Sequence, residues 1–116
     1  MAEIQRIESL PALDELFETA KEKTVWIFKH SLTCPISGAA WNEFRRFVAD
    51  QPADNPADHG AVFALIEIQY ARPVSNAVAE RTGVRHQSPQ AILLRDSRVA
   101  WHASHYDIDM KSLSRA

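Results

Sequence analysis

The sequence predicts a single α/β domain with a central mixed sheet of four to five strands and helices on both faces. Segments with the helical spacing of apolar residues alternate with short apolar runs rich in β-branched and aromatic residues. Such alternation is typical of a parallel sheet that is covered on both faces. The chain has 116 residues and is 46% apolar, so we expect one domain with one core over residues 1–116.

The first half of the chain predicts two helices and a buried strand. A helical stripe over 10–20 follows Ser9, which is a plausible N-cap. The run VWIF at 25–28 predicts a strand that is buried on both faces. A second helix is expected over 36–48, and a short strand is expected at 4–7, before the first helix. The aromatic residues at core spacings are Trp26, Phe28, Phe44, Phe47 and Phe63, whereas Trp41 and Trp101 are expected to be partly exposed.

The second half begins with a surface connection, because residues 50–60 (DQPADNPADHG) are rich in proline and aspartate. A buried strand follows at 62–68, and a helix at 73–82 is expected to end at Gly83. Strands at 91–94 and 99–101 are close enough to form a hairpin, which adds an antiparallel edge, and a short helix at 107–114 closes the chain. This order of elements is that of the thioredoxin-like fold.

Composition excludes several classes of function. A net charge of −2 gives no broad basic field for nucleic acid or an anionic membrane. No apolar run approaches the roughly 20 residues of a membrane helix, and the N-terminus has no apolar stretch of a secretory signal. One cysteine cannot form an internal disulfide or a dithiol redox pair. We therefore expect a cytoplasmic protein that binds neither nucleic acid nor membrane.

Cys34, the only cysteine, lies directly between a predicted strand and a predicted helix. Open α/β sheets place their chemistry at such junctions. The unpaired backbone N–H groups and the positive end of the helix dipole favour the thiolate, which is the nucleophilic form. Cys34 is therefore predicted to be a reactive nucleophile rather than a small buried apolar residue.

The neighbours of Cys34 fit this role. Pro35 suits an early helical position, where a missing N–H costs little. Ser37 can donate a hydrogen bond from its hydroxyl or its backbone N–H to the sulfur. Thr33 adds a polar flank, and Lys29 and His30 add positive charge near the predicted site.

A second motif, VRHQSPQ at 84–90, stands just before the strand predicted at 91–94. Proline cannot donate to a central sheet ladder, so Pro89 must mark the entry to this strand. From the residues alone, its peptide bond is left open between an ordinary trans bond and the rarer cis form.

Together the two motifs resemble a known family. The segment CPIS at 34–37 occupies the position of the thioredoxin-fold Cys-x-x-Cys motif, with Ser37 in the second place. Ser88-Pro89 occupies the position of the cis-proline of that fold. The segments HSLTCPIS at 30–37 and GVRHQSPQ at 83–90 look like those of the monothiol bacilliredoxins of the YtxJ/BrxC type, and the resemblance spans nearly the whole chain.

The resemblance implies a bacterial thiol-disulfide oxidoreductase that removes bacillithiol from oxidised cytosolic proteins. Cys34 would be the nucleophile, Ser37 would stand in place of a resolving cysteine, and Pro89 would be the cis-proline. The implied partners are S-bacillithiolated proteins and a low-molecular-weight thiol. Bacillithiol would be a co-substrate, with no bound cofactor, and we expect a monomer.

Bacillithiol carries carboxylates, so cations and polar groups around the site are expected to bind it. The predicted substrate-binding residues are Lys29, His30, Thr33, Pro35, Arg85, His86, Gln87 and Ser88. The backbone of Ser88 is expected to pair with an extended thiol or peptide. Gln87 stands where we expect glutamate in many members of the family, a change that is expected to alter affinity.

Other chemistries stay open. Monothiol glutaredoxins also carry Cys-x-x-Ser, and some bind an iron–sulfur cluster between two protomers, so a cluster carrier is the alternative function. A zinc site built on His102 and His105, or on His30 and Cys34, is weaker because no second cysteine helps, and we predict no metal site. Peroxidase chemistry is weaker too, since Cys34 has no resolving partner.

Overall fold

The computed structural model describes residues 3–51 and 61–116. Its elements are β1 (Ile4–Arg6), α1 (Leu10–Thr19), β2 (Val25–His30), α2 (Pro35–Ala49), β3 (Val62–Glu67), α3 (Arg72–Thr82), β4 (Gln90–Arg95), β5 (Arg98–Ser104), the 3₁₀ turn η1 (His105–Asp107) and α4 (Met110–Arg115). Most of the predicted connection at 50–60 lies outside the described residues, which resume at residue 61.

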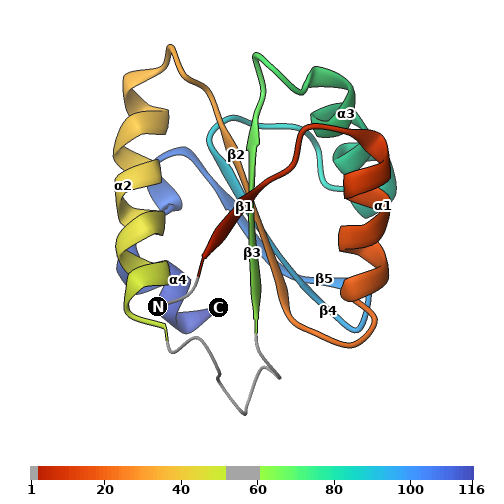
Figure 1. The fold of residues 1–116 in the computed structure, drawn as a ribbon. Coiled ribbons are helices and arrows are strands. Elements are labelled where there is room, and N and C mark those ends of the chain that lie inside the picture. Colours follow the sequence, from red (N-terminus) through yellow and green to blue (C-terminus); the bar gives the residue numbers. More distant parts are fainter. Residues whose placement is uncertain (1–2, 52–60) are drawn as a thin grey trace.

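The five strands form one mixed sheet in the order β1-β3-β2-β4-β5. The first three strands in this order are parallel, whereas β4 runs antiparallel to both β2 and β5. Helices α1 and α3 cover one face and α2 and α4 cover the other (Figure 1). The predicted mixed sheet with helices on both faces is therefore confirmed.

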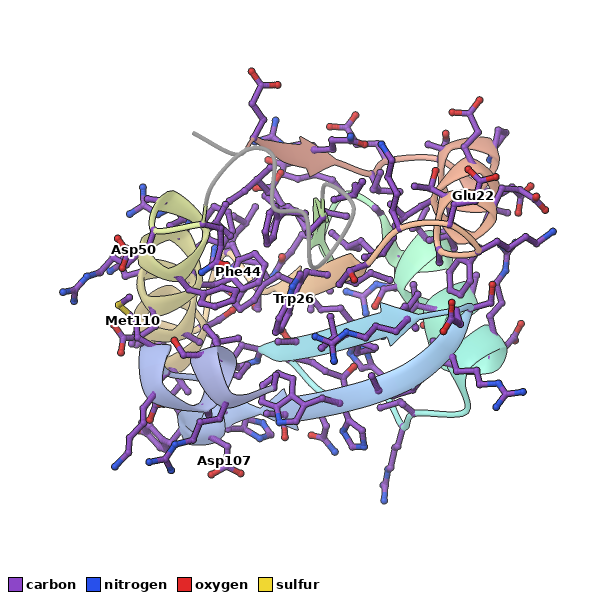
Figure 2. All side chains as sticks on the ribbon, turned by 90° about the horizontal axis from the view of Figure 1, so that it is seen from below. Glu22, Trp26, Phe44, Asp50, Asp107 and Met110 are labelled. Carbon is purple, nitrogen blue, oxygen red and sulfur yellow. The ribbon has the colours of Figure 1, made fainter. Side chains whose placement is uncertain are left out.

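Each face of the sheet carries its own apolar core. The alternation along β2 divides the strand between them, because Val25 and Ile27 face α1 and α3 while Trp26 and Phe28 face α2. On the α2 side Trp26 and Phe44 meet between the helix and the sheet (Figure 2), with their ring centroids 6.3 Å apart. The aromatic residues that the sequence assigns to the core are all buried, and Trp41 and Trp101 are partly buried as predicted.

Several boundaries differ from the prediction. Strand β2 continues two residues beyond 25–28, because Lys29 and His30 are polar yet buried members of the ladder. Both hairpin strands are longer than predicted and are joined at Asp96 and Ser97, whose φ values of 52° and 64° are those of a type I′ turn. The short helix predicted at 107–114 is present as α4, which begins only after the capping residue Asp109, because Asp107 belongs to the turn η1.

Candidate functional site

Cys34 is the N-cap residue of α2, at the end of the turn that leaves β2. Its backbone is extended, with φ −104° and ψ 120°, and Pro35 opens the helix. The side chain is partly exposed and makes no capping hydrogen bond. A lone thiol therefore stands at the positive end of a 15-residue helix, within reach of solvent.

Ser37 is fully buried, and its hydroxyl forms hydrogen bonds with partners other than the predicted one, the Cys34 sulfur. Its Oγ accepts a hydrogen bond from the Ser31 backbone N–H at 2.9 Å and lies 2.8 Å from His30 Nδ1. Among the described residues no hydrogen bond joins Ser37 to the sulfur of Cys34, so the predicted donation is not found. The hydroxyl instead links the start of α2 to the end of β2.

The His30 ring lies between polar and aromatic partners. It stacks on Trp41, with ring centroids 5.6 Å apart and an angle of 26° between the planes. Burial lowers the pKa of His30, and the nearby Glu67 carboxylate offsets part of that effect. Either neutral tautomer of His30 can make this bond, because Nδ1 can accept the hydroxyl hydrogen of Ser37 or donate its own N–H to Oγ. A protonated His30 carries a hydrogen on Nδ1 and can only donate there.

Gln69 fixes the turn before Cys34, and the sequence analysis missed it. Its Oε1 accepts from the Leu32 backbone N–H at 3.1 Å, and its Nε2 donates to Ser31 Oγ at 3.0 Å and to Thr33 Oγ1 at 3.4 Å. The only available signal was its place just after a predicted strand at the same sheet edge. Leu32 and the nearby Tyr70 expose 45% and 75% of their surface beside this turn.

The Ser88-Pro89 peptide bond is cis, as the resemblance implies. Pro89 immediately precedes β4, whose Gln90 pairs with Lys29 of β2. The sheet register therefore brings Pro89 to the same end of the sheet as the turn that carries Cys34. Of the flanking predicted residues, Gln87 and Ser88 are half-buried and Arg85 is exposed.

Lys29 is buried, although the sequence predicts it to be an exposed cation that binds the substrate. Its side chain has no exposed surface, and its ammonium donates to the Ser75 carbonyl at 2.9 Å and lies 3.1 Å from His86 Nδ1. Burial lowers the pKa of Lys29 to about 8. Direct contact with a substrate carboxylate does not fit this burial. His86 itself is exposed, and Thr33 and Pro35 are exposed beside Cys34.

The structure thus divides the predicted site residues between the two faces of the sheet. Cys34, Ser37 and His30 lie on the α2 side, whereas Lys29 faces α3, because successive residues of β2 point to opposite faces. Within residues 3–51 and 61–116 no group of three or more histidine, cysteine or acidic side chains could hold a metal ion. In the same part of the chain no helix is long and apolar enough to cross a membrane.

Comparison with known families identifies the family of this chain. The sequence profile of the family described as monothiol bacilliredoxin BrxC matches residues 5–113. The chain belongs to this family. Membership makes it a thioredoxin-like oxidoreductase of the bacilliredoxin type.

Solved structures agree with this assignment. A structure described as a candidate oxidoreductase with a thioredoxin fold is 28% identical, with a TM-score of 0.79, and the match covers 97% of this chain and 91% of that one. Thioredoxin from Malassezia sympodialis is 16% identical, with a TM-score of 0.72 over 99% of this chain and 88% of its own. Thioredoxin from Halobacterium salinarum is also 16% identical, with a TM-score of 0.70 over 97% and 86%. The two thioredoxins show a shared fold.

Proposed function

We propose that this bacilliredoxin removes bacillithiol from mixed disulfides on oxidised proteins, with Cys34 as the nucleophile. The observation that carries the proposal is a lone, partly exposed thiol at the N-cap of α2, with a buried serine where a second thiol would stand. Such a site can accept a thiol group in exchange but cannot expel it with a thiol of its own.

The first half-reaction is a thiol-disulfide exchange. The Cys34 thiolate attacks the bacillithiol sulfur of the mixed disulfide, and the client sulfur leaves with the bonding electron pair and takes up a proton. The client is then reduced and Cys34 carries bacillithiol. A protein client can bind against the exposed apolar side chains of Leu32 and Tyr70, which lie beside the thiol.

The second half-reaction needs a thiol from solution. A free bacillithiol attacks the adduct, leaves as bacillithiol disulfide and returns Cys34 to the thiolate. The exposed groups on the β2–α2 turn and on the loop before Pro89 are then available to the substrate: the Thr33 hydroxyl, Arg85 and His86, with the Ser88 backbone as a pairing edge.

Intact-mass spectrometry tests the transfer. The protein is mixed with a bacillithiolated client and, in parallel, with the same client carrying glutathione. We expect the bacillithiol mass to move to Cys34 while the client emerges reduced, and Cys34→Ser to abolish the transfer. Equal transfer of glutathione would show a generic monothiol transferase. If neither moves, Cys34 is not the exchange nucleophile, and visible absorption after anaerobic iron–sulfur reconstitution becomes the next measurement.

Ser37→Cys gives a second prediction. The new thiol lies one helical turn from Cys34, so we expect an internal disulfide to form after the first exchange and bacillithiol to be released without a second external thiol. The same change removes the hydroxyl that holds His30 and Ser31. Ser37→Ala is the matched control, because it loses these contacts without adding sulfur. An adduct that persists equally in both variants would contradict the prediction.

A further inference from the structure

A buried polar cluster lies on the face of the sheet opposite to Cys34. Its centre is Lys29, whose side chain is fully buried under α3. A buried ammonium is costly unless its protons are hydrogen-bonded, and most lysines are exposed for this reason. Lys29 sits five residues before Cys34 on the strand that leads to it, and a member of the cluster also lies on the loop that carries Pro89. A functional role would explain why a lysine is buried at this position.

The partner on that loop is His86. The Lys29 ammonium has protons to donate and no lone pair, so the contact of 3.1 Å requires His86 Nδ1 to be the acceptor. The imidazole proton must then lie on Nε2. Ser75 Oγ, 3.3 Å from the same Nδ1, can donate as well. Burial, Lys29 and the nearby Arg72 all lower the pKa of His86, so the ring is held neutral.

The cluster holds the loop at a second point. Gln90, with 1% of its surface exposed, donates from Nε2 to the Arg85 carbonyl at 2.9 Å. Gln90 pairs directly with Lys29 across the β2–β4 ladder, so the two side chains share one face of the sheet. Residues 84–89 form no helix or strand. The buried pair therefore fixes two successive residues of an otherwise irregular loop, Arg85 through its carbonyl and His86 through its ring.

His86 has one nitrogen left for a ligand. The ring is exposed, and within the described residues no hydrogen bond engages its Nε2. We propose that Lys29 is a positioning residue, whose buried ammonium holds His86 as the neutral Nε2–H tautomer and so presents a hydrogen-bond donor to the bacillithiol part of the substrate. The role in substrate binding rests on the proposed function, whereas the tautomer is a property of the free protein. Lys29 acts through His86 and does not touch the substrate.

Nitrogen NMR of the imidazole in the free protein tests the first half of the proposal. We expect the wild-type signals of His86 to show a protonated Nε2 and a bare Nδ1 at pH 7. In Lys29→Met the ring is expected to mix both tautomers and to titrate closer to the ordinary value of about 6.5. A wild-type ring that is protonated on Nδ1, or an unchanged ring in Lys29→Met, would overturn the proposal whatever the activity.

Steady-state kinetics with the bacillithiolated client test the second half. Lys29→Met is expected to raise KM about five-fold and to leave kcat within about two-fold, as for loss of one hydrogen bond to the ground state and transition state alike. His86→Phe should raise KM similarly, and the double variant should be no worse than either alone. His86→Gln, which keeps a neutral donor near the Nε2 position, should recover part of the loss. Lys111→Met, on the exposed surface of α4, is the matched control.

Each kinetic outcome decides one claim. Additive losses in the double variant would mean that Lys29 does not act through His86, and an unchanged KM in both single variants would remove the role in binding while the proposed function stands. Lys29→Met removes the cost of burying an ammonium and leaves no unpaired charge behind, so the variant should stay folded. If wild-type protein transfers no bacillithiol, the proposed function and the role in binding both fail, and the NMR measurement alone decides the tautomer.

Discussion

Two adjacent polar residues at the end of β2 face opposite layers of the molecule. Lys29 reaches under α3 to His86, and His30 reaches under α2 to Ser37. Each therefore ties the strand that precedes Cys34 to another segment of the site, Lys29 to the loop before Pro89 and His30 to the first turn of α2. The site is organised by buried hydrogen bonds rather than by exposed charge.

The His30 pair makes stability depend on pH. Burial lowers the folded-state pKa of His30, with Glu67 opposing part of the shift. The unfolded chain takes up this proton near the ordinary value of about 6.5, so between that value and the lower folded-state pKa it binds more protons than the native state. Stability should therefore fall as the pH drops from 7 towards 5.5. Asparagine keeps an acceptor for Ser37 without titrating there, so urea unfolding should show a smaller loss for His30→Asn. Parallel losses would contradict this origin.

For single residues, the sequence predicted local position better than burial and hydrogen-bond partners. The position of Cys34 at the start of α2 could be predicted, because a residue between a strand and a helix is a local pattern. The burial of Lys29 could not be foreseen, because lysine is usually exposed and its partners, Ser75 and His86, are 46 and 57 residues away in the chain. Gln69 was missed for the same reason, since its role depends on how the end of β3 lies against the β2–α2 turn.

Among the elements, the β4–β5 hairpin carries the clearest local strain. Asp96 and Ser97 adopt left-handed backbone angles that favour glycine, in a turn whose Ser97 N–H donates to the Ala20 carbonyl at 2.9 Å. The turn thus joins the end of α1 to the sheet, and its conformation is kept although the side chains disfavour it.

Ser97→Gly should therefore stabilise the protein. Removing the Cβ relieves about 1–2 kcal/mol of left-handed strain in the folded state. The higher conformational entropy of glycine in the unfolded chain lowers the free energy of unfolding by about 0.5–1 kcal/mol. We expect a net gain of about 0.5 kcal/mol in the free energy of unfolding, measured by chemical denaturation. Ser114→Gly, within α4, is the control of opposite sign. A loss at both positions would show that the turn is not strained.

Helices and strands with a strong periodicity of apolar residues were predicted well, whereas short elements were predicted less well. The helices at 10–20 and 73–82 and the strand at 62–68 agree with α1, α3 and β3 to within a residue. The segment at 107–114 carries few apolar residues, and its structure is set by contacts of α4 with α2, including a bond from the Met110 N–H to Glu43. The cis form of the Ser88-Pro89 bond rested on the resemblance, because local sequence does not distinguish the two forms.

Over the whole molecule, one sheet is shared by two cores. Strands β2, β3 and β4 contribute side chains to both, so neither layer can separate without exposing the other. We expect a single cooperative transition in urea. Tryptophan emission reports on the α2 side, where all three tryptophans lie, and far-UV circular dichroism reports on the helices of both faces. The two curves should coincide, and a helical loss that precedes the change in emission would show that α1 and α3 open first.

The stacking of Trp41 on His30 gives the molecule an optical reporter. Trp41 lies against a ring that is hydrogen-bonded to Ser37, three residues after Cys34. A charge placed on the His30 imidazole, or a shift of the first turn of α2, changes the electric field at the indole and hence the wavelength and yield of its emission. If Cys34 carries bacillithiol during the exchange as proposed, formation and loss of the adduct should change this emission, which stopped-flow fluorescence of the unlabelled protein can measure.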